Sequence, residues 1–128
     1  MENKKIIKLE YPLNCSIKLL FDRLSTASGL SEWFADDVDI EGETFIFKWS
    51  KTEQRANIVS LKKEKSVRFH WIDEDEDDEA YFEFDIFTHE LTGSVSLIIT
   101  DFVYQSDEID VTDLWNKQIN KLKSAIGA

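Results

Sequence analysis

The stretch from residue 110 to residue 126 constrains the fold most, because its apolar residues recur at the spacing of one helix face. At about 100° per residue the apolar stripe is roughly 140° wide, enough to lie against a sheet. Asp110 is expected to cap the first amide groups, and Gly127 offers a left-handed stop. An amide, Gln118, interrupts the stripe, and a buried amide needs a protein partner, water or a ligand. The stripe consists of Val111, Leu114, Trp115, Gln118, Ile119, Leu122, Ala125 and Ile126.

Before this helix, apolar and polar residues alternate along several segments, which is the pattern of strands with one buried face. Short connections join nearly all of these segments and favour an antiparallel meander. Pro12 is expected to end the first strand, and Ser16 to cap a short helix over residues 16–24. A second short helix is expected to begin at Ser28 or Gly29. The predicted strands cover residues 6–11, 38–41, 44–50, 55–61, 67–72, 81–87 and 94–101.

The order of these elements predicts an α+β fold. A curved antiparallel sheet of about six or seven strands, wrapped around the long C-terminal helix, buries both apolar faces at once. The 128 residues include one proline and four glycines, and their composition does not shift along the chain. We therefore expect a single domain over residues 1–128.

The net charge of −11 disfavours nucleic acid and anionic membrane surfaces as partners. No stretch approaches the roughly 20 apolar residues that span a bilayer, and the first residues lack a signal-peptide core. The single cysteine, Cys15, fits a reducing compartment. The sequence therefore predicts a cytoplasmic protein that is not embedded in a membrane, and it leaves the oligomeric state open.

Residues 30–36 read Leu-Ser-Glu-Trp-Phe-Ala-Asp and stand just before the first predicted hairpin. With the order strand, two short helices, sheet and long helix, this segment resembles the START-like (SRPBCC) helix-grip superfamily. The nearest likeness is to the branch related to the activator of the heat-shock-protein-90 ATPase. There a Trp-Phe pair closes the second short helix, matched by Trp33 and Phe34, and the terminal helix carries spaced apolar residues, matched by Trp115, Ile119 and Leu122.

The resemblance implies a START-like domain with a cavity between the sheet and the terminal helix. The superfamily includes lipid carriers, polyketide cyclases, plant hormone receptors and co-chaperone domains, so the fold by itself selects no single function. No catalytic motif associated with the cyclase or oxygenase members is visible in the chain.

Large aromatic side chains on the predicted strands and helices have two interpretations. They line a cavity for a hydrophobic or flat ligand, or they pack the core solid. The set consists of Trp33, Phe34, Phe45, Phe47, Trp49, Phe69, Trp71, Phe82, Phe84 and Trp115.

Asp101 and Gln118 are the polar residues expected to face inward. Asp101 shares the parity of the apolar residues on its strand, and Gln118 lies within the apolar stripe. They contact a ligand, or Gln118 bonds a sheet carbonyl and Asp101 lies at an exposed strand end. The expected ligand-binding residues are Trp33, Phe34, Phe47, Trp49, Phe69, Trp71, Phe84, Asp101, Trp115, Gln118 and Ile119.

Other candidate sites are weaker. Residues 73–79 are all acidic, but an EF-hand would need glycine and glutamate where this chain has Asp78 and Phe84, which leaves a solvated loop or a dock for a basic partner. His70 and His89 lack metal-ligand spacing, so no metal or cofactor is expected. Cys15 precedes a helix, a position that lowers a thiol pKa, but no base can be placed beside it.

The leading hypothesis is non-enzymatic binding of a hydrophobic small molecule or lipid between the sheet and the terminal helix. One alternative is a co-chaperone-like protein-interaction module that uses its acidic surface to bind a protein partner. The other is a cyclase or hydrolase-type enzyme that uses the same cavity and needs a polar pair inside it.

Overall fold

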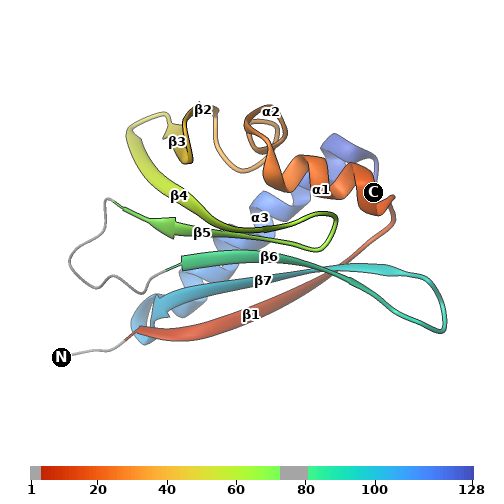
Figure 1. Cartoon of the computed structure of the whole chain (residues 1–128). Coiled ribbons are helices and arrows are strands. Elements are labelled where there is room, and N and C mark those ends of the chain that lie inside the picture. The colour runs from red at the N-terminus through yellow and green to blue at the C-terminus, as the bar shows by residue number, and fades with distance from the viewer. Residues whose placement is uncertain (1–3, 73–80) are drawn as a thin grey trace.

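The computed structural model of the chain describes residues 4–72 and 81–128. Its elements are β1 (Lys4–Leu13), α1 (Ile17–Ser25), α2 (Ala27–Leu30), β2 (Asp37–Glu41), β3 (Thr44–Trp49), β4 (Thr52–Lys62), β5 (Ser66–Trp71), β6 (Tyr81–Thr88), β7 (Val95–Tyr104), the 3-10 helix η1 (Gln105–Asp107) and α3 (Glu108–Ile126). Within these residues, seven antiparallel strands form one sheet in the order β1-β7-β6-β5-β4-β3-β2. Figure 1 shows this sheet curving around α3, which confirms the predicted architecture.

Strand alternation places the aromatic residues on the face that meets α3. In the β5–β6 register Phe69 lies opposite Phe82, and Val67 lies opposite Phe84. All four are buried, because successive side chains of a strand point to opposite faces and these share one parity. The period-two pattern in the sequence therefore predicted the inward face correctly.

The first strand is longer than predicted, since β1 continues through Pro12 to Leu13. Pro12 lies opposite Ser96 in the register with β7. Because β1 is at the edge of the sheet, a proline that lacks an amide N–H is tolerated there. The expectation that Pro12 ends the strand was wrong for this reason.

The two short helices lead into the turn that carries Trp33 and Phe34 into the core. Ser16 caps α1 as predicted, and its Oγ accepts from the Leu19 amide at 3.1 Å. The second helix begins at Ala27, before both of the expected starts, Ser28 and Gly29, and Thr26 Oγ1 caps it. Helix α2 ends at Leu30, so Trp33 and Phe34 lie in the turn that follows it.

Helix α3 begins two residues before the predicted start. Its N-cap is Asp107, so Asp110 lies in the first helical turn and the prediction that it caps the helix was wrong. Gly127 ends the helix in the left-handed conformation as predicted, with φ of 72°. The buried stripe is narrower than predicted, because Leu114 and Ala125 are exposed. The buried residues of α3 are Trp115, Gln118, Ile119 and Leu122.

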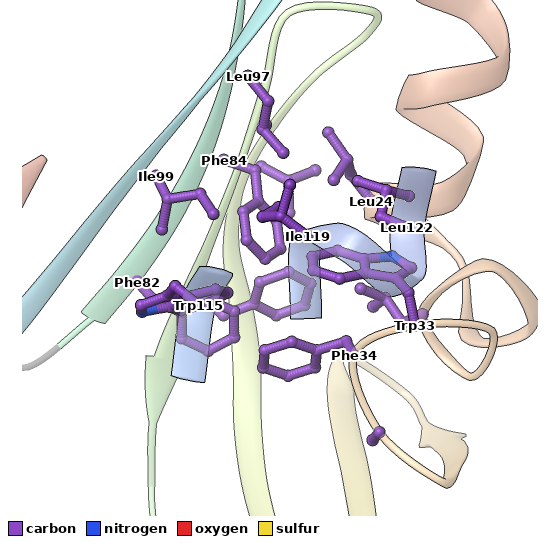
Figure 2. Packing of buried hydrophobic residues seen from close by; sticks show 14 of the residues in the cluster. Leu24, Trp33, Phe34, Phe82, Phe84, Leu97, Ile99, Trp115, Ile119 and Leu122 are labelled. Carbon is purple, nitrogen blue, oxygen red and sulfur yellow. The ribbon is translucent and has the colours of Figure 1, made fainter. Parts of the chain in front are cut away.

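Aromatic side chains fill the middle of the space between sheet and helix, with Phe34 at its centre. Phe34 stacks on Phe82 at 5.4 Å and on Trp115 at 5.7 Å between ring centroids, and it meets Phe47 edge-on at 5.0 Å. Figure 2 shows Phe34 reaching in from the turn after α2 toward the side chains of α3 and β6. The central space is therefore packed core.

None of the helices in the described residues is long and apolar enough to cross a membrane.

Candidate functional site

A hollow of about 490 Å³ lies beside this packed centre, against the N-terminal half of α3. The adjoining ends of β3, β4, β5 and β7 form its other walls, at the end of the sheet where the N-terminus lies in Figure 1. We call it the aromatic cleft. Its lining residues are Lys4, Phe34, Trp49, Thr52, Gln54, Trp71, Asp101, Phe102, Val111, Leu114, Trp115 and Gln118.

The structure divides the expected ligand-binding residues between the cleft and the core. The cleft brings together Phe34, Trp49, Trp71, Asp101, Trp115 and Gln118. The packed core takes Trp33, Phe47, Phe69, Phe84 and Ile119, all of which are buried.

The backbone carbonyl of Phe34 accepts hydrogen bonds from two side chains that line the cleft. It accepts from Gln118 Nε2 at 2.9 Å and from Trp49 Nε1 at 3.0 Å. Gln118 is 7% exposed, so this bond satisfies an amide that would otherwise be costly to bury. The partner is a carbonyl of the turn after α2, where we expected a ligand or a sheet carbonyl. Gln118 therefore ties α3 to that turn, and Trp49 ties β3 to the same carbonyl.

Asp101 faces α3, as the parity of its strand predicts. Its Oδ2 accepts from Trp115 Nε1 at 2.9 Å, and its Oδ1 accepts from the Phe102 amide at 2.8 Å. Both carboxylate oxygens are therefore engaged, and the bond to Trp115 fixes the orientation of that indole in the cleft wall. Asp101 acts here as a positioning residue.

Several lining residues were missed by the sequence analysis. Thr52 and Gln54 have the inward parity of Ala56, but the strand was predicted to begin at Arg55. Extending the alternation backward from Ala56 would have found them. Lys4 precedes the predicted start of its strand, and Phe102 has the parity of the outer face, so no sequence signal places either one in the cleft.

A second hollow of about 380 Å³ adjoins the cleft along α3. The two share Phe34, Trp49, Leu114 and Gln118 in their linings. Leu114 lines both hollows, and its side chain is 55% exposed.

The remaining candidates do not join this site. Burial raises the pKa of the Cys15 thiol, so the expectation of a lowered pKa was wrong. Within residues 4–72 and 81–128, no group of His, Cys, Asp or Glu side chains is arranged to hold a metal ion. The acidic run 73–79 lies outside the described residues.

A cluster of charged side chains lies on the face of the sheet away from α3. Arg68 Nε donates to Glu83 Oε1 at 2.6 Å across the β5–β6 register. Burial, followed by the hydrogen bond and charge of Glu83, raises the pKa of Asp85 to about 7. Burial alone would raise the pKa of Glu83, but hydrogen bonds with Asp85 and Arg68 lower it. Asp85 therefore keeps its proton up to nearly neutral pH while Glu83 is ionised.

Raising the pH from about 5 to about 8 is expected to destabilise the protein through Asp85. Its folded pKa of about 7 lies above the ordinary value of 3.8, so the folded state holds the proton more tightly and stability falls as the pH approaches 7. The shift corresponds to about 4 kcal/mol without screening, and partial exposure reduces our expectation to about 1–2 kcal/mol. The lowered pKa of Glu83 affects stability only below about its ordinary value of 4.5, which lies outside this pH range.

Urea unfolding of wild type and Asp85→Asn at the two pH values measures this effect. The variant is expected to lose less stability than wild type as the pH rises. Equal losses in the two proteins would contradict the raised pKa of Asp85.

The whole chain, residues 1–128, matches the family model described as START-like superfamily domain. A solution structure from Bacteroides fragilis is 39% identical, covers 96% of this chain and 91% of its own, and has a TM-score of 0.67. The Aha1 dimer from Colwellia psychrerythraea is 17% identical over 95% of this chain and 96% of its own, with a TM-score of 0.81.

A Bacillus halodurans protein is 16% identical over 98% of this chain and 99% of its own, with a TM-score of 0.75. At such identities, it and the Colwellia protein show likeness of fold alone. No curated protein matches the chain in sequence.

Proposed function

The chain belongs to the START-like superfamily, and on that premise we propose that it binds a hydrophobic small molecule or lipid in the aromatic cleft without transforming it. The superfamily fold serves ligand binding and interaction modules, and the cleft itself favours the first role. Its volume of about 490 Å³ lies in the range of roughly 300–1,000 Å³ that small-molecule sites occupy.

Partly exposed aromatic walls make the cleft suited to an apolar ligand. Trp49 and Trp71 are only half-buried, although both pack on buried rings, at 5.7 Å from Phe34 and 4.8 Å from Phe82. A ligand that covers their remaining surface gains roughly 25 cal/mol for each Å² of apolar area removed from water.

The polar groups of the cleft favour binding over catalysis. Asp101 holds Trp115 with one oxygen and the Phe102 amide with the other, and Gln118 donates to the Phe34 carbonyl. These bonds hold Asp101 and Gln118 against the cleft walls, which suits a structural role better than proton transfer to or from a substrate. An enzyme of the cyclase or hydrolase kind would have to use other groups.

The charge of the chain and its cysteine bear on its partners and its location. A net charge of −11 favours partners other than nucleic acid, and one unpaired cysteine fits the cytoplasm. A protein partner for the acidic run 73–79 is the second candidate. This second candidate rests on the sequence alone, whereas ligand binding is supported by the geometry of the cleft as well.

Replacing Leu114 with glutamate is expected to weaken binding of the neutral fluorescent probe N-phenyl-1-naphthylamine about tenfold. Leu114 lines the cleft at 55% exposure, so the new carboxylate stays hydrated while it faces the apolar probe. Desolvating it on binding would cost about 1.4 kcal/mol or more, which is the tenfold change. Probe fluorescence titration gives the affinities.

The matched control is Ile109→Glu, which adds the same charge to the same helix. Ile109 is 77% exposed and does not line the cleft, so the affinity of this variant for the probe should stay within about twofold of wild type. Neither variant should change the free energy of unfolding by more than about 0.5 kcal/mol. Equal weakening by both variants, or no binding to wild type, would remove the cleft as the ligand site.

A further inference from the structure

The indole N–H groups differ in whether the protein supplies an acceptor. Trp33 and Trp49 donate to backbone carbonyls at 2.9 and 3.0 Å, and Trp115 donates to Asp101 at 2.9 Å. Trp71 lines the aromatic cleft, and within the described part of the chain its indole N–H has no acceptor. Half-buried indoles normally find a partner for this group, which makes Trp71 a donor available to a ligand.

Gln54 is a second polar group of the cleft wall that no protein group engages. It is half-buried, and its carboxamide makes no hydrogen bond with residues 4–72 or 81–128. Ala56 lies opposite Trp71 in the β4–β5 register, and Gln54 is two residues before Ala56 on the same face. Such diagonal neighbours are roughly 7–8 Å apart, within reach of a long side chain. An indole N–H and a carboxamide therefore border the same part of the cleft.

The charged residues of the lining are oriented away from the cleft or already bonded. Lys4 has the outward parity of β1, opposite to buried Ile7, and its Nζ lies 5.3 Å from the centroid of the Tyr104 ring. Each carboxylate oxygen of Asp101 already accepts a hydrogen bond from the protein. An anionic ligand group would therefore lie near a carboxylate, with no inward-facing cation among the described lining residues. The groups left for a ligand are uncharged.

From these groups we propose that the ligand of the aromatic cleft is an uncharged, flat molecule whose carbonyl oxygen accepts from the Trp71 indole and the Gln54 amide. A carbonyl oxygen has two lone pairs, so it can satisfy both donors while the aromatic walls cover the rest of the molecule. Gln54 then contributes to specificity, because a ligand without the carbonyl would leave both donors unpaired. This inference rests on the proposed function, since it assigns a ligand class to the same cleft.

Three competitors of matched shape test the ligand class by displacing N-phenyl-1-naphthylamine. 2-Acetylnaphthalene carries the carbonyl, 2-isopropenylnaphthalene has a CH₂ group in place of its oxygen, and 2-naphthoate is the anionic counterpart. Gln54→Leu is expected to weaken binding of the ketone about fivefold, or about 1 kcal/mol, and to leave the alkene within about twofold of its wild-type affinity. Trp71→Phe keeps an aromatic wall without the N–H and should have the same selective effect. Wild type should bind 2-naphthoate more weakly than the ketone.

Thr52→Val is the matched control, because it removes a polar group from the same strand and cleft wall at nearly constant size. Thr52 is two residues farther than Gln54 from the strand position opposite Trp71, so both the ketone and the alkene should keep their affinities within about twofold. Equal effects of Gln54→Leu on the ketone and the alkene, or tighter binding of 2-naphthoate than of the ketone, would overturn the uncharged carbonyl class and leave the cleft function standing. If wild type binds none of these compounds, both the cleft function and the ligand class fall.

Discussion

Replacing Trp115 with alanine is expected to lower the free energy of unfolding by about 3–5 kcal/mol. Trp115 is 5% exposed and stacks on Phe34 at 5.7 Å, while Phe84 meets it edge-on at 5.9 Å. Alanine would leave a cavity between α3 and the sheet and would also remove the donor that satisfies Asp101. Urea unfolding followed by circular dichroism measures the change, since that signal does not depend on the lost indole.

Two further variants separate the contributions of packing and hydrogen bonding. Trp115→Phe keeps most of the stacked ring but leaves Asp101 Oδ2 without the indole donor, and we expect it to cost about 1–2 kcal/mol. Leu114→Ala removes the neighbouring side chain, which is 55% exposed, and should cost less than about 1 kcal/mol. If Trp115→Ala cost no more than Leu114→Ala, the apolar stripe of α3 would not face a core.

The arrangement of Trp115, Phe82 and Phe69 was predictable because it depends on local periodicity. Helical spacing places Trp115 on the buried side of α3, and alternation places the two phenylalanines on the inner face of the sheet. The inward direction of Asp101 follows from the same rule. Each of these predictions needs only the geometry of a single element, which the order of residues determines directly.

The position of the cleft depends on how side chains from distant elements share space. Phe34 reaches the core from a turn and lies between Phe82 and Trp115, so it fills the centre where the family resemblance implied a cavity. The remaining hollow lies at the end of the sheet, beside Trp49 and Trp71. Side-chain volumes decide this outcome, and they combine only once the chain is folded.

The partner of Gln118 was unpredictable for a different reason. All residues carry the same backbone carbonyl, whatever their side chain. No residue type therefore marks Phe34 as the acceptor for Gln118 and Trp49. Sequence could identify the amide that needs a partner. Only the turn after α2, which brings that carbonyl to α3, determines which group satisfies it.

Gly29→Ala is expected to destabilise the protein by about 3 kcal/mol, although alanine is the better helix former by about 1 kcal/mol. A methyl group at this position would lie 2.5 Å from the Asp22 carbonyl oxygen and 2.6 Å from the Arg23 Cα, both of them backbone atoms of α1. It would also lie 2.8 Å from Thr26 Oγ1, which caps α2 by accepting from the Gly29 amide. Relief requires α2 to move away from α1.

That movement connects stability to the cleft, because the turn carrying Phe34 is anchored on α2. The Leu30 carbonyl accepts from the Phe34 amide at 2.8 Å, so displacement of α2 also displaces the carbonyl that holds Gln118 and Trp49. Gly29→Ala should therefore weaken binding of N-phenyl-1-naphthylamine in addition to lowering the urea midpoint. Ser28→Ala is the matched control on the exposed side of α2 and should be neutral or slightly stabilising. Similar stability of the two variants would mean that α1 and α2 are not in close backbone contact at Gly29.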